Sequence, residues 1–178
     1  MGFDGFALNI GDPTPAFVRN TLTYMFNYAH GKNFKLFVSM DVYAAGNAGK
    51  GLSDYYPILR DFLGNPAYYK GPNGYPFIST FGDGGLTNTQ WNSFKSTYAN
   101  QLYFVPDFDQ TQGYYTADPG WWGYWGGVVD GVFSWESAWP YVGATNAGSV
   151  DLDKTVIAGT NQHGKSYMMR MFIRSSLV

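Results

Sequence analysis

Short apolar segments that alternate with longer segments of helical character constrain the fold of this chain most. Five such segments begin near residues 3, 34, 76, 103 and 128 of a chain of 178 residues. They are too short for typical helices, and turn residues bound several of them, which is typical of buried strands. Strands that alternate with helices form parallel sheets. The sequence therefore predicts an α/β fold, either an open doubly wound sheet or a (β/α)8 barrel.

The expected elements can be placed by residue range. We expect strands at 3–10, 34–41, 76–81, 103–108 and 128–136. The first helix opens at Thr14 and Pro15, with Thr14 as its cap, and ends at Gly31. Ser53 and Asp54 cap a second, short helix, and a third spans 87–101. We expect residues 65–75 to form a loop and leave 112–127 unassigned. Residues 155–159 are either a strand or the end of a helix, and 164–169 lead into a further strand.

Composition excludes several classes of protein and site. The chain has 11 basic and 13 acidic residues and a net charge of −2, so it lacks the basic surface that nucleic-acid binding requires. No apolar run reaches the roughly 18 residues of a membrane span. Cysteine is absent, which excludes thiolate sites, and His30 and His163 are too few for an ordinary zinc site. We therefore expect a monomer without a cofactor, a metal, nucleic acid or a membrane partner.

Each expected strand ends on polar or acidic side chains. In chain order these are Asn9, Ser39 with Asp41, Ser79 and Thr80 with Asp83, Asp107 with Asp109, and Ser134 with Glu136. The carboxyl ends of parallel strands share one face, where the sites of α/β enzymes form. Acidic residues after strands also cap helices or form turns, which is the expected role of Asp12 and Asp54. Capping alone does not explain five consecutive strand ends.

Aromatic residues accompany these strand ends. They make up 20% of the chain, more than a small core uses, and Tyr43, Tyr114, Trp135 and Trp139 are the candidates nearest to the acidic groups. Aromatic rings stack on sugar faces, and carboxylates bind sugar hydroxyls. Two carboxyl groups can also supply the acid and the base or nucleophile of glycoside hydrolysis. The combination predicts a carbohydrate site.

Five sequence blocks occur in a fixed order: DGFALNIG at 4–11, FKLFVSMD at 34–41, PFISTF at 76–81, FVPD at 104–107 and DGVFSWESAWP at 130–140. Together they resemble glycoside hydrolase family 71, the endo-α-1,3-glucanases or mutanases found mainly in fungi. The resemblance implies a (β/α)8-type catalytic domain that hydrolyses the α-1,3-glucan of cell walls with inversion. It also implies an extracellular or cell-wall location, although the residues after Met1 carry no secretory signal.

Inversion requires an acid and a base about 6.5–9.5 Å apart, with a water between them. The candidates for this pair are Asp107, Glu136 and Asp83, with Glu136, beside Trp135, as the acid and Asp107 as the base. The expected substrate-binding residues are Asn9, Asp41, Tyr43, Tyr114, Trp135 and Trp139.

The chain departs from the family pattern at both ends. Family members have a strand before the one at Phe3, and they continue past residues 167–169 into further elements. The expected fold is thus a partial (β/α)8 TIM-type barrel over residues 1–169 that lacks strands at both ends, followed by an unrecognised tail at 170–178. An unclosed barrel exposes edge strands, so low stability and loss of activity are open outcomes.

Two other classes of function stay open at this point. The first is a non-catalytic α/β domain that binds carbohydrate through the aromatic groove. The second is an open α/β domain that binds an unrelated small ligand.

Overall fold

The computed structural model describes residues 3–135 and 149–169 of the chain. Four strands form a parallel sheet in chain order: β1 (Gly5–Ile10), β2 (Lys35–Asp41), β3 (Phe77–Phe81) and β4 (Tyr103–Val105). Two more, β5 (Gly131–Ser134) and β6 (Ser166–Met169), pair in parallel with each other. The predicted α/β class with parallel strands is confirmed.

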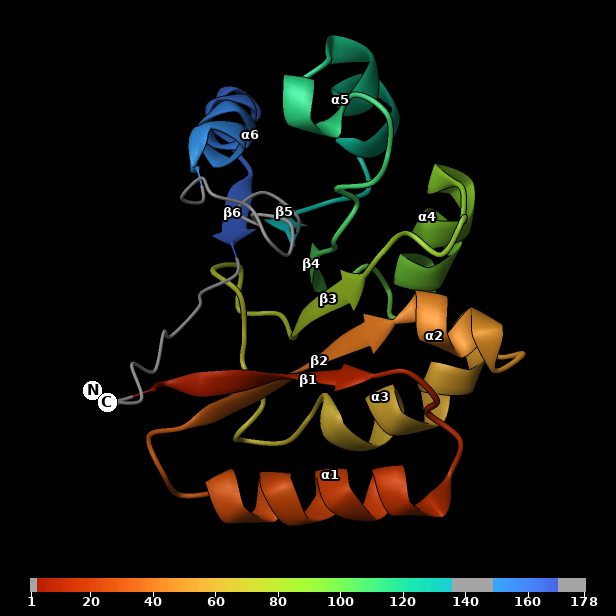
Figure 1. The fold of residues 1–178 in the computed structure, drawn as a ribbon. Coiled ribbons are helices and arrows are strands. Elements are labelled where there is room, and N and C mark those ends of the chain that lie inside the picture. Colours follow the sequence, from red (N-terminus) through yellow and green to blue (C-terminus); the bar gives the residue numbers. More distant parts are fainter. Residues whose placement is uncertain (1–2, 136–148, 170–178) are drawn as a thin grey trace, which may run out of the picture.

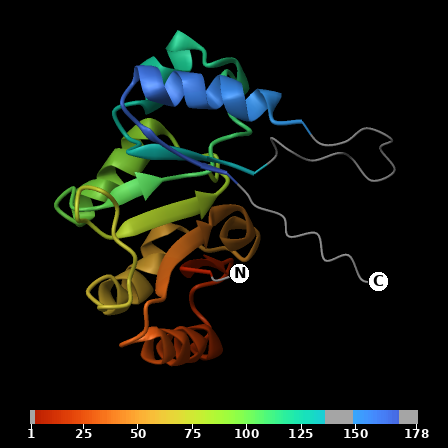
Figure 2. The same ribbon diagram turned by 90° about the vertical axis from the view of Figure 1, so that its left-hand side faces the viewer.

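The two groups of strands are joined between β4 and β5. Asp107 and Phe133 form a parallel bridge, and the Phe133 N–H donates to the Pro106 carbonyl at 2.9 Å. At the other end of β5, the Asp130 N–H donates to the Phe104 carbonyl at 2.8 Å. The six described strands therefore run parallel in the order of the chain, as a four-stranded and a two-stranded sheet that lie side by side (Figures 1 and 2).

Helices occupy the connections between the strands (Figure 1). They are α1 (Ala16–Ala29), α2 (Val42–Asn47), α3 (Tyr56–Phe62), α4 (Asn88–Thr97), α5 (Pro119–Trp125) and α6 (Asp151–Gln162). Two short 3-10 helices, η1 (Leu52–Tyr55) and η2 (Tyr114–Thr116), precede α3 and α5. Residues 155–159 are thus helical, and the further strand expected at the end of 164–169 is β6, which already begins at Ser166.

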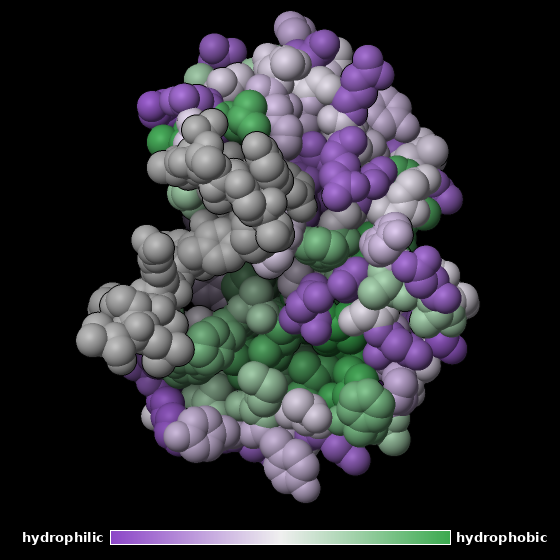
Figure 3. All heavy atoms as spheres, viewed as in Figure 1, coloured by the Kyte–Doolittle hydropathy of each residue, from purple (hydrophilic) through white to green (hydrophobic). Residues whose placement is uncertain are grey.

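Side chains pack on both faces of the sheet, because alternate residues of a strand point to opposite sides. Toward the helices, Leu36, Val38 and Ile78 belong to a large core that extends from α1 to α6. On the other face, a smaller cluster joins three strands, β3, β4 and β5, through Phe77, Tyr103, Val105 and Phe133. Phe37, Trp135 and Met168 pack against it. Apolar surface gathers in a hollow on the face seen in Figure 3.

Local chemistry explains where some elements begin. The Thr87 side chain accepts from the Gln90 N–H, and the Gln90 side chain accepts from the Thr87 N–H, so the two residues cap α4 reciprocally. The predicted Thr14 cap of α1 is wrong. Pro15 stands at that position, and the Thr14 N–H and hydroxyl both donate to Asp12 at 2.9 and 2.7 Å. Asp12 is therefore a turn residue, as expected.

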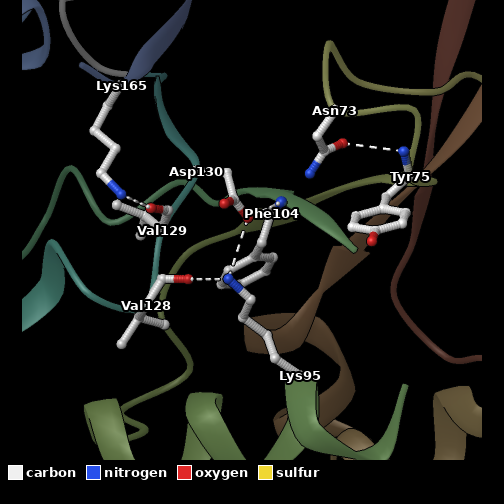
Figure 4. A network of polar contacts seen from close by, with 8 residues as sticks. All are labelled: Asn73, Tyr75, Lys95, Phe104, Val128, Val129, Asp130 and Lys165. Carbon is white, nitrogen blue, oxygen red and sulfur yellow. Dashed lines mark hydrogen bonds and ion pairs between the residues drawn. The ribbon is translucent and has the colours of Figure 1, made fainter. Parts of the chain in front are cut away.

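All five predicted strands are shorter than their predicted ranges, and β4 and β5 differ most. The β4 strand ends at Val105. Pro106, which has no N–H to donate, follows it, and Asp107 forms a single bridge with Phe133 before the chain turns at 109–110. The β5 strand begins at Gly131 rather than at 128. The carbonyls of Val128 and Val129 each accept from a lysine, Lys95 and Lys165, at 2.7 Å (Figure 4). Side chains satisfy these carbonyls where a strand partner otherwise would.

Candidate active site

Acidic and aromatic side chains meet at the carboxyl ends of the strands, as the sequence predicts. Asp41 is the last residue of β2 and stands in register with Phe81 at the end of β3. Asp107 follows β4 and stands opposite Phe133 of β5. The parallel register therefore brings both carboxyl groups to the same edge of the sheet.

Asp107 and Asp109 form a buried carboxyl pair at this edge. Asp107 is 2% exposed and Asp109 5%. The Asp109 N–H donates to Asp107 Oδ1 at 3.3 Å, and the Asp107 N–H donates to the Thr80 hydroxyl at 3.1 Å. Thr80 in turn donates to the Gly82 carbonyl at 2.8 Å, so the turn after β3 supports the pair.

The surroundings of Asp107 favour its protonated form. Burial is the main cause, and the negative charge of Asp109 and a hydrogen bond between the two carboxyl groups act in the same direction; together they raise the pKa of Asp107 to about 8. Backbone N–H groups of Asp109 and Gly82 oppose this rise only in part. A carboxyl group in this state can donate a proton near neutral pH, which suits an acid better than the predicted base.

Asp109 also connects β4 to the end of β5. Its Oδ2 atom accepts from the Trp135 N–H at 2.8 Å and from the Tyr115 hydroxyl at 2.7 Å. Burial and the adjacent Asp109 carboxylate raise the pKa of Tyr115, so its hydroxyl keeps the proton that it donates. The position of Trp135 therefore depends on a buried acid 26 residues before it.

Asn9 and Asp41 contact each other across β1 and β2. The Asn9 amide donates to Asp41 Oδ2 at 3.0 Å. Asp41 Oδ1 accepts from the Ala44 N–H at 2.9 Å and so caps α2, a helix that the sequence analysis did not predict. Asp41 thus has a structural role, and its predicted contact with substrate stays a prediction.

A cavity of about 320 Å³ opens beyond the end of β3. Its lining includes Asp83, Tyr43 and Phe81, so it joins one predicted acid with one predicted sugar-binding ring. Tyr43 is 68% exposed. The turn that carries Asp83 is shaped by Gly84, whose φ of +64° favours glycine and whose added Cβ would lie 3.0 Å from Val42 Cγ2.

The remaining aromatic candidates have different positions. Trp135 is partly buried, and its ring packs edge-on against Phe81 with centroids 5.2 Å apart. Tyr114 is only 3% exposed, and its hydroxyl donates to the Phe133 carbonyl at 3.0 Å, so it lies beneath the strand ends rather than at the open surface. Glu136 and Trp139 lie outside the described residues.

The sequence model of glycosyl hydrolase family 71 matches residues 1–173. The chain belongs to glycosyl hydrolase family 71. This finding confirms the resemblance of the five sequence blocks and identifies the chain as a member of a glycosidase family, whose substrates are polysaccharides. A comparison with curated proteins gives no match.

The carboxyl pair cannot by itself flank a bond in this family 71 protein. Acid and nucleophile lie about 5–5.5 Å apart in retaining glycosidases, and acid and base about 6.5–9.5 Å apart in inverting ones. Asp107 and Asp109 hydrogen-bond to each other, which is too close for either arrangement. The two carboxyl groups therefore form one hydrogen-bonded unit, and a pair of carboxyl groups at either separation would need a further residue.

Sequence reasoning placed Asp109 at a strand end but did not predict its pairing with Asp107 or its contact with Trp135. It did not name Tyr115 as a residue of the site. The Asp-Phe-Asp spacing placed two acids after one strand. Nothing local in 112–127 indicated that Tyr115 reaches back to Asp109, since its contact depends on how η2 folds over β4.

Within residues 3–135 and 149–169 the family 71 chain has no group of three or more His, Cys, Asp or Glu residues that could hold a metal ion. In the same ranges, every helix is too short or too polar to cross a membrane.

Proposed function

We propose that this chain hydrolyses α-1,3-glucosidic bonds in cell-wall glucan and inverts the anomeric configuration. The observation that carries the proposal is the buried Asp107–Asp109 pair at the carboxyl edge of a parallel sheet, in a chain of a glycosidase family. The proposed linkage and place of action are carried over from the resemblance to the family. We propose that the chain acts as a monomer in the cell wall or the extracellular space.

The arrangement of the strands supports a barrel-type site. Six described strands run parallel in chain order, and helices occupy the connections between them. We propose that they form an arc of a (β/α)8 barrel. Active sites of such barrels form at the carboxyl ends of the strands, where the acids of this chain gather.

In the proposed mechanism Asp107 is the general acid and protonates the glycosidic oxygen as the bond to the anomeric carbon breaks. A second carboxylate removes a proton from the water that attacks the opposite face of the sugar. Asp83 is the described candidate for this base, because it lines the cavity beside the pair. Glu136 is the other candidate, from sequence alone.

Aromatic and polar side chains would orient the sugar. Tyr43 offers an exposed ring beside Asp83, and Trp135 offers a partly exposed ring beside Phe81. Asn9 and Asp41 form a polar pair at the same edge and can bind sugar hydroxyls. In this proposal Tyr114 supports the site from beneath the strand ends, through its hydrogen bond to the Phe133 carbonyl at the end of β5. Trp139 is proposed as a sugar-binding residue from the sequence alone.

The test is reducing-sugar release from α-1,3-glucan by the purified chain, with the anomer of the product followed by NMR. Asp107→Asn should lower kcat by about 100-fold or more, since it removes a proton donor. Asp118→Asn is the matched control: Asp118 only caps α5, through the Gly120 N–H, and activity should persist.

Other outcomes would overturn the proposal. Near-normal activity of Asp107→Asn would exclude Asp107 as the acid. Glucan binding in calorimetry without sugar release would favour the non-catalytic carbohydrate-binding alternative. A product with retained configuration would exclude inversion.

A further inference from the structure

Asp109 occupies a junction of three elements that meet at the site. It follows β4, accepts from the end of β5 through Trp135, and accepts from η2 through Tyr115. Its own N–H donates to Asp107. Few side chains of the described residues are both this deeply buried and connected to so many elements, and simple glycoside hydrolysis does not assign Asp109 a role.

We propose that Asp109 is a positioning residue that holds the Asp107 carboxyl group and the end of β5 in one arrangement and keeps the proton on Asp107. This inference rests on the proposed function, because it concerns the acid of that reaction. It adds a residue that acts through Asp107 and does not itself touch the substrate.

The contacts of Asp109 support its role in fixing the Asp107 carboxyl group and the end of β5. Both donors, the Trp135 N–H and the Tyr115 hydroxyl, contact the same oxygen, Oδ2, at 2.8 and 2.7 Å. Two donors on one oxygen restrict the rotation of the carboxyl group, and the burial of Asp109 excludes water as a competing partner. The Asp107 carboxyl group therefore faces a fixed neighbour.

The element that carries Tyr115 is itself firmly placed. Gly113 and Ala117, on either side of η2, have φ values of +92° and +51°. Ala117 adopts this costly conformation without being glycine, which indicates that its surroundings impose it. The Asp118 N–H closes the turn on the Gly113 carbonyl at 3.1 Å.

The charge of Asp109 supports its role in keeping Asp107 protonated. Asp109 is the charged group that acts most strongly on Asp107, after burial itself. Tyr115 on η2 also interacts electrostatically with Asp107, and its raised pKa keeps its hydroxyl neutral. Removal of the Asp109 charge should therefore release the Asp107 proton at lower pH.

The first arm of the test is an NMR titration of the full chain with ¹³C-labelled aspartate carboxyl groups. The Asp107 signal is identified by its loss in Asp107→Asn. In Asp109→Asn the amide oxygen can still accept from Trp135 and Tyr115, but the charge is gone. The Asp107 midpoint should fall by about one pH unit or more. An unchanged midpoint overturns the proposal, whatever the activity.

The second arm measures activity on α-1,3-glucan, and it distinguishes the positioning role of the Asp109 side chain from the effect of its charge. The alkaline limb of the pH–rate profile should move to lower pH in Asp109→Asn, since an acid acts only below its own pKa. Below that limb Asp109→Asn should keep most of its kcat, whereas Asp109→Ala, which loses both acceptors, should lose about 10-fold or more. A role in folding alone would reduce the yield of folded protein and leave the limb in place, and that result contradicts the proposal.

The two arms also distinguish the proposals from each other. If the wild-type chain releases no sugar while the Asp107 midpoint still falls in Asp109→Asn, the proposed function fails and the link between Asp109 and Asp107 stands. If the wild type is active and the midpoint and limb do not move, the function stands and the role of Asp109 is overturned. Asp118→Asn serves as the control in both arms and should match the wild type.

Discussion

At the scale of single residues, burial decides what Asp107 can do. The sequence places this acid directly after a strand. That position alone does not show whether the carboxyl group is exposed and ionised or buried and protonated. The structure buries it beside Asp109, and the raised pKa that results changes its proposed role from base to acid. The chemistry of the group thus depends on neighbours from β3, β5 and η2.

The raised pKa of Asp107 predicts how stability depends on pH. The folded state binds the Asp107 proton up to about pH 8, whereas the unfolded chain releases it near the ordinary value of 3.8. Asp107 therefore stabilises the fold fully below about pH 4, and this contribution is lost as pH rises toward 8. The slope should be at most about 1.4 kcal/mol per pH unit.

Thermal unfolding between pH 5 and pH 8.5 measures this dependence. Asp107→Asn, which cannot titrate, should flatten the decline and should be relatively more stable at the alkaline end. An equal decline in the variant and the wild type would show that other groups cause it.

At the scale of elements, one buried lysine, Lys95, connects α4 to the β4–β5 edge. Lys95 of α4 donates to the Val128 carbonyl at 2.7 Å and to Asp130 Oδ2 at 3.1 Å, and that oxygen also accepts from the Phe104 N–H at 2.9 Å (Figure 4). The Lys95 side chain is only 11% exposed. This network sets where β5 begins and how it stands beside β4.

We expect Lys95→Met to destabilise the fold by about 2–3 kcal/mol, because it leaves the buried Val128 carbonyl without its lysine donor and removes the cation that pairs with Asp130. Urea unfolding measures the change. Lys154→Met is the matched control, since its ion pair with Asp151 is exposed, and it should leave the unfolding midpoint unchanged. A similar small effect for both variants would contradict the structural role of Lys95.

At the scale of the whole molecule, one core connects the first helix to the last. The large core cluster includes Phe26 of α1, Phe104 of β4 and Val156 of α6. The two sheets are also linked directly, by the bridge between Asp107 and Phe133 and by the hydrogen bond from the Asp130 N–H to the Phe104 carbonyl.

We therefore expect the chain to unfold in one cooperative transition. Near-UV and far-UV circular dichroism should give the same midpoint, and the packed aromatic residues should give a strong near-UV signal. Separate transitions would show that the β1–β4 and β5–β6 parts fold independently. A weak near-UV signal with normal far-UV intensity would indicate loose packing and would predict an inactive chain.

The sequence alone was sufficient for the order and approximate place of the strands and for the edge that carries the acids, but not for where β4 ends or β5 begins. Apolar runs such as 34–41 survive in the fold because a strand buried on both faces needs apolar residues throughout. The capping pair at Thr87 and the turn at Asp12 also follow from neighbouring residues, because both interactions are local. The five sequence blocks were sufficient for the family.

Only the tertiary structure decided how the acids differ. The pairing of Asp107 with Asp109, the reach of Tyr115 and the burial of Tyr114 depend on contacts between elements, and no local pattern encodes such contacts. The short helices α2 and α5 also lack enough turns to show a clear periodicity. Local sequence therefore determined which groups reach the edge of the sheet. Long-range packing determined which of them are buried, paired and protonated, because desolvation and electrostatic interactions depend on the residues that are neighbours in space.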